Sequence, residues 1–297
     1  MYALPGVRAA AVLVAVLLAT LPGTAAGQTA GQTAGPATQV LRTAEAREAF
    51  LDNADVVGAR QLGKGVTKPW RLTLKEGDVV QDAAFQDVDA HKEEARFRSG
   101  RTERDFRDFY GYNIAAYRLA RLLGYDDLVP VSIERVWKGR RGALTWWVDK
   151  KWDEDERVKE GVEPSDVPAW ERQLYLARAF TALVADTDRN LGNQLVTADF
   201  HLWLIDFTRA FRHTQELKTP SLLRRIDRRF YDRLKALREE DVEAALSRWV
   251  EPLARKALLA RRDAMVEHFA VLADQRGDQS AVFYESDPMS PRSQEQP

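Results

Sequence analysis

The feature that most constrains the fold is a short polar loop between a long amphipathic segment and two brief apolar runs. The loop, residues 186–193, reads Asp-Thr-Asp-Arg-Asn-Leu-Gly-Asn, and the runs Leu195–Val196 and Leu202–Ile205 follow it. Short apolar runs bounded by polar turn residues are typical of buried strands. We therefore predict a polar loop followed by a buried hairpin. Three polar side chains lie at the ends of this hairpin: Asp188, Asn193 and Asp206.

The chemistry of these three side chains suggests a metal site. Carboxylate and amide oxygens are hard ligands, which suit Mg²⁺ or Mn²⁺. A further carboxylate beside them can take a proton from an attacking hydroxyl group. The same residue types also crowd ordinary turns, so a loop without chemistry is the alternative interpretation of this segment.

The spacing of these residues also resembles a known class of site. An Asp five residues before an Asn, followed after a hairpin by Asp-Phe, is similar to the phosphoryl-transfer sites of the kinase superfamily. The form Asp-Arg-x-x-x-Asn, then Ile-Asp-Phe, resembles the atypical kinases: the phosphoinositide-3/4-kinase-like group, the secreted casein-type kinases and the bacterial persistence-toxin kinases. The resemblance implies ATP as cofactor, Asp188 as the catalytic residue, and Asn193 and Asp206 as metal ligands. Asp186 is the alternative catalytic residue.

A β-rich lobe is predicted before this segment, because Ala59–Asp89 alternates short β-like runs with turns. Within it, Gly63, Lys64 and Gly65 form a glycine loop whose backbone N–H groups can approach phosphate oxygens closely. An ordinary hairpin turn is the competing interpretation of these residues.

The sequence departs from the kinase pattern at the lysine that holds the nucleotide phosphates. The corresponding strand ends in Gln86, and the helix predicted over Phe109–Leu123 carries Asn113 where a glutamate would be expected. Together they predict an amide–amide hydrogen bond in place of an ion pair. The loss of charge favours a pseudokinase, a folded binding module, as the alternative function. Other residues that could supply the missing charges are Lys64, Lys68, Lys75, Glu93, Glu94 and Asp108.

A second predicted hairpin, Ser132–Trp137 with Ala143–Val148, resembles the run into a kinase hinge. On that resemblance Trp147 and Val148 border the adenine, while at least one of the two adjacent tryptophans packs in the core. The charged segment Lys150–Val167 then predicts a surface connection between two lobes.

Helical periodicity dominates the second half of the chain. Pro168–Ala185 is predicted to form an amphipathic helix that leads into the polar loop. Three more helices are predicted over Ser221–Leu237, Glu240–Val250 and Pro252–Ala273. The overall prediction is an α+β, two-lobed, protein-kinase-like fold. Its parts are an N-lobe (40–149), a connection (150–167) and a helical C-lobe (168–274).

Thr208 follows Asp206-Phe207 where kinases usually have glycine, and it restricts the backbone that glycine would free. Arg209 and Arg212 come next. They could bind phosphate, but pairing with acidic neighbours is the role that we favour.

The termini carry different signals. Arg8, the apolar run Ala9–Leu21 and small residues up to Ala26 predict a cleaved signal peptide (1–26), because a bilayer span needs about 20 residues. An uncleaved membrane anchor is the alternative interpretation of this segment. We therefore expect export to the periplasm or the medium, with no stable membrane span after cleavage. Residues 27–39 and 275–297 are poor in large apolar groups and predict a flexible linker and a disordered tail. Four motifs, including Asn-Ile-Ala-Ala-Tyr and Trp-Trp-Val-Asp, resemble a set of exported bacterial proteins.

Composition excludes several classes of function. The chain has no cysteine, which excludes disulfides, thiolate metal sites and cysteine nucleophiles. Because 44 Lys and Arg nearly balance 45 Asp and Glu, no global field attracts nucleic acid. The four histidines show no metal-ligand spacing, which disfavours a metal-dependent hydrolase. The resemblance to atypical kinases implies ATP- and metal-dependent phosphotransfer, with a nucleotide and a protein or small-molecule hydroxyl as partners.

Overall fold

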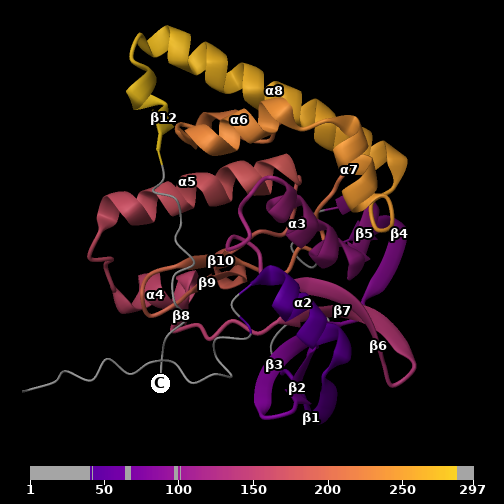
Figure 1. The fold of residues 1–297 in the computed structure, drawn as a ribbon. Helices are drawn as coiled ribbons and strands as arrows, with labels where there is room; N and C mark the ends of the chain where they lie inside the picture. The colour runs from indigo at the N-terminus through magenta and orange to yellow at the C-terminus, as the bar shows by residue number, and fades with distance from the viewer. Residues whose placement is uncertain (1–40, 42, 64–67, 97–99, 101, 286–297) are drawn as a thin grey trace, which may run out of the picture. The chain divides into compact units, whose positions relative to one another are not determined.

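Five antiparallel strands form the sheet of the first half of the fold (Figure 1). Their order is β1-β2-β3-β7-β6, so the last two strands add on beside β3. Leu72 and Leu74 are buried between more open neighbours on β2, which is the period of two that a half-buried strand requires. The strands are β1 (Asp55–Gln61), β2 (Trp70–Glu76), β3 (Val79–Gln86), β6 (Ser132–Trp137) and β7 (Arg140–Trp146).

The structure, a computed structural model, describes residues 41, 43–63, 68–96, 100 and 102–285. All of these belong to one compact unit. The predicted signal peptide and linker lie outside the described residues, as do Lys64, Gly65 and residues 286–297.

Two helices pack against the sheet, α2 (Ala44–Asn53) and α3 (Gly111–Leu122). α2 begins after Thr43, whose hydroxyl accepts a backbone N–H of the first turn. The hydroxyl of Tyr117 donates to Glu48 at 2.6 Å and so joins α3 to α2. The helix predicted at the position of α3 is confirmed, whereas α2 was not predicted.

A further hairpin, which the sequence did not predict, is inserted between β3 and α3. Its strands, β4 (Asp89–Arg96) and β5 (Thr102–Phe109), pair with each other in a separate two-stranded sheet. Most of their side chains are exposed or half-buried. Without a buried apolar face there is no apolar alternation to mark these strands in the sequence. We call this element the inserted hairpin.

The segment predicted as a surface connection contains regular structure. Strand β8 (Trp152–Asp153) pairs with β9 (Gln194–Val196), which in turn pairs with β10 (Leu202–Leu204). Helix α4 (Glu154–Glu160) follows β8 directly. The prediction of a surface connection is wrong for these residues, because pairing with β9 buries both residues of β8.

Helices α5 to α8 make up most of the second half (Figure 1). The longest, α8, contacts α5, α6 and α7. No helix within the described ranges is both long and apolar enough to cross a bilayer. The bounds are α5 (Val167–Leu183), α6 (Arg228–Ala236), α7 (Glu239–Leu246) and α8 (Pro252–Arg276).

The predicted helices agree with α5 and α8 closely, and Pro252 occupies the first turn of α8 as expected. The helix predicted from Ser221 begins only at Arg228, because a 3₁₀ turn (Pro220–Leu222) and strand β11 (Ile226–Asp227) precede it. The apolar segment Leu128–Val131, which precedes β6, does not form a strand. Pro130 has no N–H to give to a strand ladder.

The tail predicted to be disordered from residue 275 is ordered as far as residue 285. Strand β12 (Phe283–Tyr284) pairs in parallel with β11, and both of its side chains are buried. The ring of Phe283 lies 4.9 Å from that of Tyr231. Two aromatic residues therefore dock a segment whose composition is otherwise polar.

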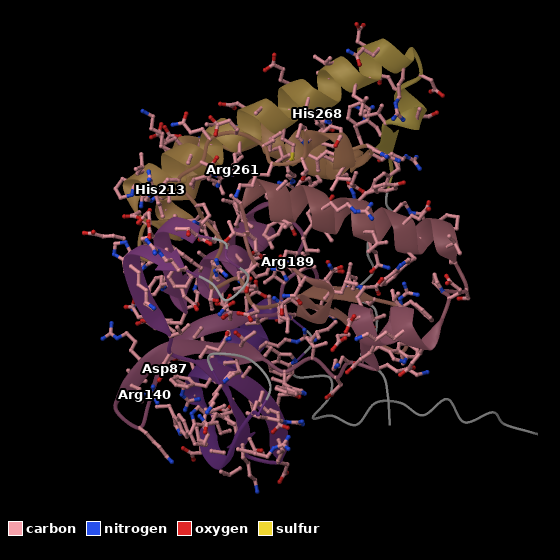
Figure 2. All side chains as sticks on the ribbon, turned by 180° about the vertical axis from the view of Figure 1, so that it is seen from behind. Asp87, Arg140, Arg189, His213, Arg261 and His268 are labelled. Carbon is pink, nitrogen blue, oxygen red and sulfur yellow. The ribbon has the colours of Figure 1, made fainter. Side chains whose placement is uncertain are left out.

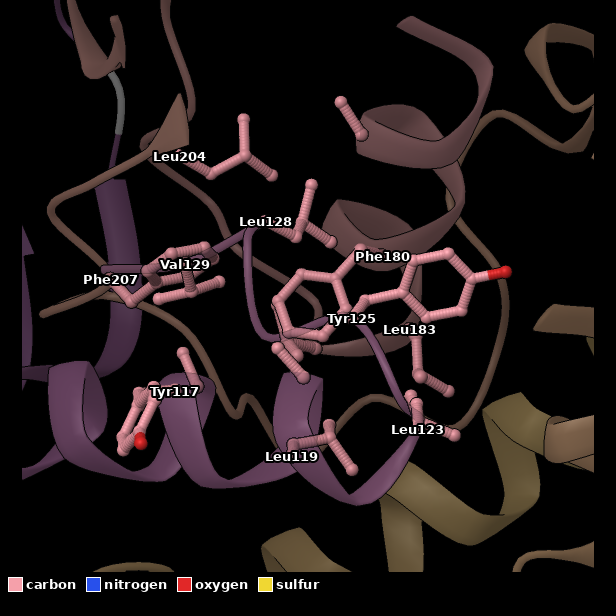
Figure 3. Packing of buried hydrophobic residues seen from close by; sticks show 14 of the residues in the cluster. Tyr117, Leu119, Leu123, Tyr125, Leu128, Val129, Phe180, Leu183, Leu204 and Phe207 are labelled. Carbon is pink, nitrogen blue, oxygen red and sulfur yellow. The ribbon is translucent and has the colours of Figure 1, made fainter. Parts of the chain in front are cut away.

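One apolar core connects α5 with the hairpin of β9 and β10 (Figure 3). Phe180 on α5 is fully buried, and its ring meets that of Phe207 edge-on with 5.8 Å between centroids. Because Phe207 directly follows Asp206, core packing fixes the residue next to the predicted metal ligand.

Three buried tyrosines predict how stability depends on pH. Burial, in each case the largest cause, raises the pKa of Tyr117, Tyr125 and Tyr284, and carboxylate neighbours raise it further. In the unfolded chain these tyrosines ionise near pH 10. Above that pH the unfolded state binds fewer protons than the native state, so stability falls as pH rises. Denaturant titrations at increasing pH should show this loss of stability. Tyr125→Phe should make the free energy of unfolding fall less steeply with pH above about pH 10.

Candidate active site

The predicted polar loop follows α5 and leads into the predicted hairpin of β9 and β10. A 3₁₀ turn at Leu191–Asn193 closes the loop, and the side chain of Asn190 accepts the N–H of Gly192 at 2.9 Å. The N–H of Ile205 donates to the carbonyl of Asn193 at 3.1 Å, so the two ends of the hairpin lie together. The predicted order of loop, strand, turn and strand is confirmed.

Arg189, which is labelled in Figure 2, connects this loop to the second end of the hairpin. Its guanidinium donates to the backbone carbonyls of Asn193 at 2.8 Å and Ile205 at 2.6 Å. It also pairs with Asp186 at 2.6 Å and lies 4.3 Å from the centre of the Phe207 ring. Arg189 is a site residue that the sequence analysis quoted within its motif but gave no role.

The two candidate catalytic carboxylates lie in opposite environments. The side chain of Asp186 is fully buried; besides pairing with Arg189, it accepts the backbone N–H of Asp188 at 3.0 Å. The side chain of Asp188 is 53% exposed. An acceptor hydroxyl can reach Asp188 but not Asp186, so the alternative assignment of catalysis to Asp186 conflicts with its burial. Asp186 instead holds the loop that presents Asp188.

Asp206 is held in an unusual conformation. Its φ angle is +58°, a left-handed value that costs a non-glycine residue about 1 kcal/mol or more. The side-chain amide of Gln86 and the hydroxyl of Thr208 approach its Oδ1 at 3.5 Å and 3.3 Å. Both contacts are longer than ordinary hydrogen bonds, so this carboxylate can take a stronger ligand.

The predicted amide–amide hydrogen bond is present beside Asp206. The Nδ2 of Asn113 donates to Oε1 of Gln86 at 2.8 Å. Asn113, which is buried, also accepts the backbone N–H of Phe207 at 2.7 Å. A chain of uncharged amides therefore links α3, β3 and the residue after Asp206.

We predict that this amide chain stabilises the fold. Asn113→Leu should lower the free energy of unfolding by about 2–4 kcal/mol, because the backbone N–H of Phe207 and the side-chain Oε1 of Gln86 would each lose the hydrogen bond to Asn113. Chemical denaturation measures the loss. Asn53→Leu, at an exposed position of α2, is the matched control and should change stability by no more than about 0.5 kcal/mol. Equal effects of the two substitutions would contradict the prediction.

A third carboxylate, Asp108 on β5, belongs to the same site. Its Oδ1 is buried and accepts no hydrogen bond from the described residues. Burial is the largest cause that raises the pKa of Asp108, and the charge of Asp188 raises it further. Burial likewise raises the pKa of Asp206, against the opposing charge of Arg189, and the charge of Asp108 adds to the rise. Asp108 therefore lies close enough to Asp188 and to Asp206 for their charges to interact with its own.

The predicted metal site contains carboxylate and amide oxygens, the ligand types that a hard divalent cation prefers. The predicted ligands Asn193 and Asp206 come from the two ends of the hairpin, and the orphaned Oδ1 of Asp108 adds a carboxylate oxygen. Within the described ranges, no group of three or more His, Cys, Asp or Glu side chains is arranged to hold a metal ion. The amide of Asn193 and the phosphates of a nucleotide would have to complete the coordination shell.

The predicted hinge residues lie where β7 ends. Trp146 is buried and Trp147 is half-buried, with the Arg71 guanidinium 4.3 Å from the centre of its ring. The backbone N–H of Trp147 donates to Asp82, and its carbonyl accepts from a side chain of β3. An adenine edge bound here would use the backbone of Val148 or a neighbour rather than the N–H of Trp147.

The predicted glycine loop connects β1 with β2. Gly63 is exposed, and an added Cβ there would meet no atom within 4 Å, so packing does not require glycine at this position. Lys64 and Gly65 lie outside the described residues. A phosphate-binding role of this loop remains a prediction.

The segment after Asp206 is held by acidic partners, as favoured from the sequence. Arg209 pairs with Glu103 and Asp188, and Arg212 pairs with Glu103 at 3.3 Å. Thr208 is buried, and its carbonyl accepts the backbone N–H of Phe109 at 2.9 Å. Both arginines are thus engaged in ion pairs with the inserted hairpin.

Comparison with known proteins supports the fold. No protein-family model matches the sequence, and no match was found among curated proteins. The structure is similar to a crystal structure of the Golgi casein kinase, with a TM-score of 0.53 and 11% sequence identity over 82% of this chain and 79% of that one. A crystal structure of a Helicobacter pylori proinflammatory kinase, CtkA, gives a TM-score of 0.45 at 9% identity over 76% and 96%. The chain has an atypical-kinase-like α+β fold, as predicted.

Sequence reasoning missed the contribution of the inserted hairpin to the site. Glu103 was not considered, and Asp108 was only one of three acids proposed for another role. Both lie on β5, whose sequence Thr-Glu-Arg-Asp-Phe-Arg-Asp-Phe has charged residues on both faces. Their position beside Asp188 arises from contacts between distant segments, for which a single sequence carries no local signal.

Proposed function

We propose that the chain is an exported phosphotransferase of the atypical kinase-like class. It would use ATP with Mg²⁺ or Mn²⁺ and act on a hydroxyl group of a protein or a small molecule. One observation carries the proposal: within a kinase-like fold, two carboxylates flank one buried hairpin. They are the exposed carboxylate of Asp188 and the weakly hydrogen-bonded carboxylate of Asp206, whose backbone has a left-handed φ angle.

The proposed reaction uses each residue in a defined way. Asp188 accepts the proton of the acceptor hydroxyl while the oxygen of that hydroxyl forms a bond to the γ-phosphorus of ATP. The bond between that phosphorus and the β–γ bridging oxygen breaks, and ADP leaves with the electron pair. Asp206, Asn193 and Asp108 would hold the divalent ion, which neutralises charge on the phosphates.

A second function is favoured by the uncharged pair of Gln86 and Asn113. Their hydrogen bond keeps β3 and α3 together without supplying a positive charge for the phosphates. A pseudokinase that serves as an exported binding module would need only this architecture. ATP is scarce outside the cytoplasm, so an exported enzyme would also need a donor supplied by another cell.

Nucleotide binding tests the proposal most directly. Calorimetry on the chain from residue 27 onward should detect ATP binding that requires Mg²⁺ or Mn²⁺. Asp206→Ala should abolish it, and Asp199→Ala, at the exposed turn of the same hairpin, should leave it unchanged. If a folded sample bound no ATP in the presence of Mg²⁺ and none in the presence of Mn²⁺, the enzyme proposal would be rejected in favour of the binding module.

A further inference from the structure

The inserted hairpin contacts the segment that follows Asp206 along much of its length. The carbonyl of Thr208 accepts the N–H of Phe109, and Arg212 and His213 pair with acidic residues of β5. His213 pairs with Asp105 of β5, with 3.1 Å between Nδ1 and Oδ2, and its other ring nitrogen pairs with Glu251 at 2.8 Å. The hairpin is therefore part of the structure around the candidate site.

Arg209 is the residue through which this hairpin reaches the catalytic loop. Its side chain is only 8% exposed. One terminal nitrogen lies 3.1 Å from Oδ1 of Asp188, the other pairs with Glu103, and the guanidinium lies 5.0 Å from the centre of the Phe106 ring. These neighbours fix the plane of the guanidinium. Since Glu103 also pairs with Arg212, its own carboxylate is held from two directions.

We propose that Arg209, held by Glu103, is a positioning residue for Asp188 in the proposed phosphotransfer. Arg209 holds one carboxylate oxygen of Asp188, while the side chain remains 53% exposed toward an acceptor. This proposal rests on the proposed function and adds a role for the inserted hairpin, which supplies Glu103 from outside the catalytic loop.

The chemistry of arginine suits this role. A planar fork binds two carboxylates with fixed relative geometry, whereas the compact ammonium of a lysine cannot hold both in the same way. A base displaced by about 1 Å can lose on the order of 100-fold in rate, so fixing the Asp188 carboxylate affects the chemical step. A purely structural ion pair would instead affect stability and leave the turnover of the folded enzyme unchanged.

The test compares turnover with nucleotide binding in five variants, of which four carry one substitution and one carries two. Glu103→Gln and Arg209→Met remove the two halves of the contact, and Arg209→Lys keeps the charge without the fork. Asp89→Asn is the matched control, because Asp89 lies on β4 of the same hairpin and pairs with Arg107 at 2.8 Å. For each variant, kcat, KM for ATP, ATP affinity by calorimetry and thermal unfolding are measured on the chain from residue 27 onward.

We expect Glu103→Gln and Arg209→Met to lower kcat by about 10- to 100-fold, with ATP affinity unchanged. Arg209→Lys should recover part of the loss, and it keeps the question answerable if Arg209→Met fails to fold. The double variant Glu103→Gln/Arg209→Met should lose no more than Arg209→Met alone. Asp89→Asn should match the wild type.

Two negative outcomes can be told apart. If the wild type transfers phosphate and the Glu103 and Arg209 variants keep their kcat, or change only KM, the positioning role is wrong and the proposed function stands. If the folded wild type transfers no phosphate to any acceptor, including itself and water, the proposed function fails and the positioning role fails with it.

Discussion

Replacing Asp188 with asparagine is expected to lower phosphotransfer by about 10²- to 10⁴-fold, the usual contribution of a general base. The structure gives the reason: Asp188 is the exposed carboxylate of the loop, whereas Asp186 is buried against Arg189. Asparagine keeps the size of the side chain and removes the group that takes the proton. ATP affinity should stay near that of the wild type, since the proposed metal ligands are unchanged.

The measurement is turnover with radiolabelled ATP, first with the chain itself as acceptor and then with hydroxyl-bearing candidates. Asp199→Asn, at the exposed turn of the same hairpin, controls for the loss of one carboxylate. Full activity of Asp188→Asn would rule out this residue as the base. If Asp188→Asn and Asp206→Asn also restored every phenotype of a strain lacking the gene, catalysis itself would be the wrong assignment.

Phe180→Ala is expected to lower the free energy of unfolding by about 3–5 kcal/mol. Phe180 is fully buried in the core between α5 and the hairpin, where its ring meets that of Phe207 edge-on (Figure 3). Truncation removes apolar contact and leaves a cavity that the surrounding helices fill only in part. Since Phe207 follows Asp206, the cavity should also weaken metal-dependent ATP binding.

Guanidinium titration gives the stability loss, and calorimetry on the folded variant gives the effect on binding. Phe180→Leu, which leaves a smaller cavity, should lose less. Val80→Ala, at a position 57% exposed on β3, is the surface control and should change stability by no more than about 0.5 kcal/mol. A loss of under about 1 kcal/mol for Phe180→Ala would mean that this core tolerates the missing ring.

Local patterns predicted the elements that form the candidate site. The periodicity of Pro168–Ala185 predicted α5, and the two short apolar runs after residue 193 predicted β9 and β10. The departure from the kinase pattern at Gln86 and Asn113 predicted a hydrogen bond that the structure contains. In each case, the signal lay in residues close in sequence or in a resemblance to known motifs.

The features that could not be predicted from the sequence depend on contacts between distant segments. Trp152 and Asp153 lie among charged residues, so only their pairing with β9 shows that they are buried. Phe283 and Tyr284 are two aromatic residues in a polar tail, and their burial depends on β11, more than fifty positions earlier. Glu103 reaches Arg209 only because β5 folds back on the segment after Asp206.

The attachment of α3 has a consequence for how the site responds to ligand. At one end Asn113 binds the backbone after Asp206, and further along Tyr117 and Arg121 both bind Glu48 of α2. To swing outward, a helix must break all of these contacts at the same time. The elements that move in proteins are those with few buried contacts. We therefore expect α3 to keep its position when a ligand binds at Asp206, so that the ligand would bind to residues that are already in place.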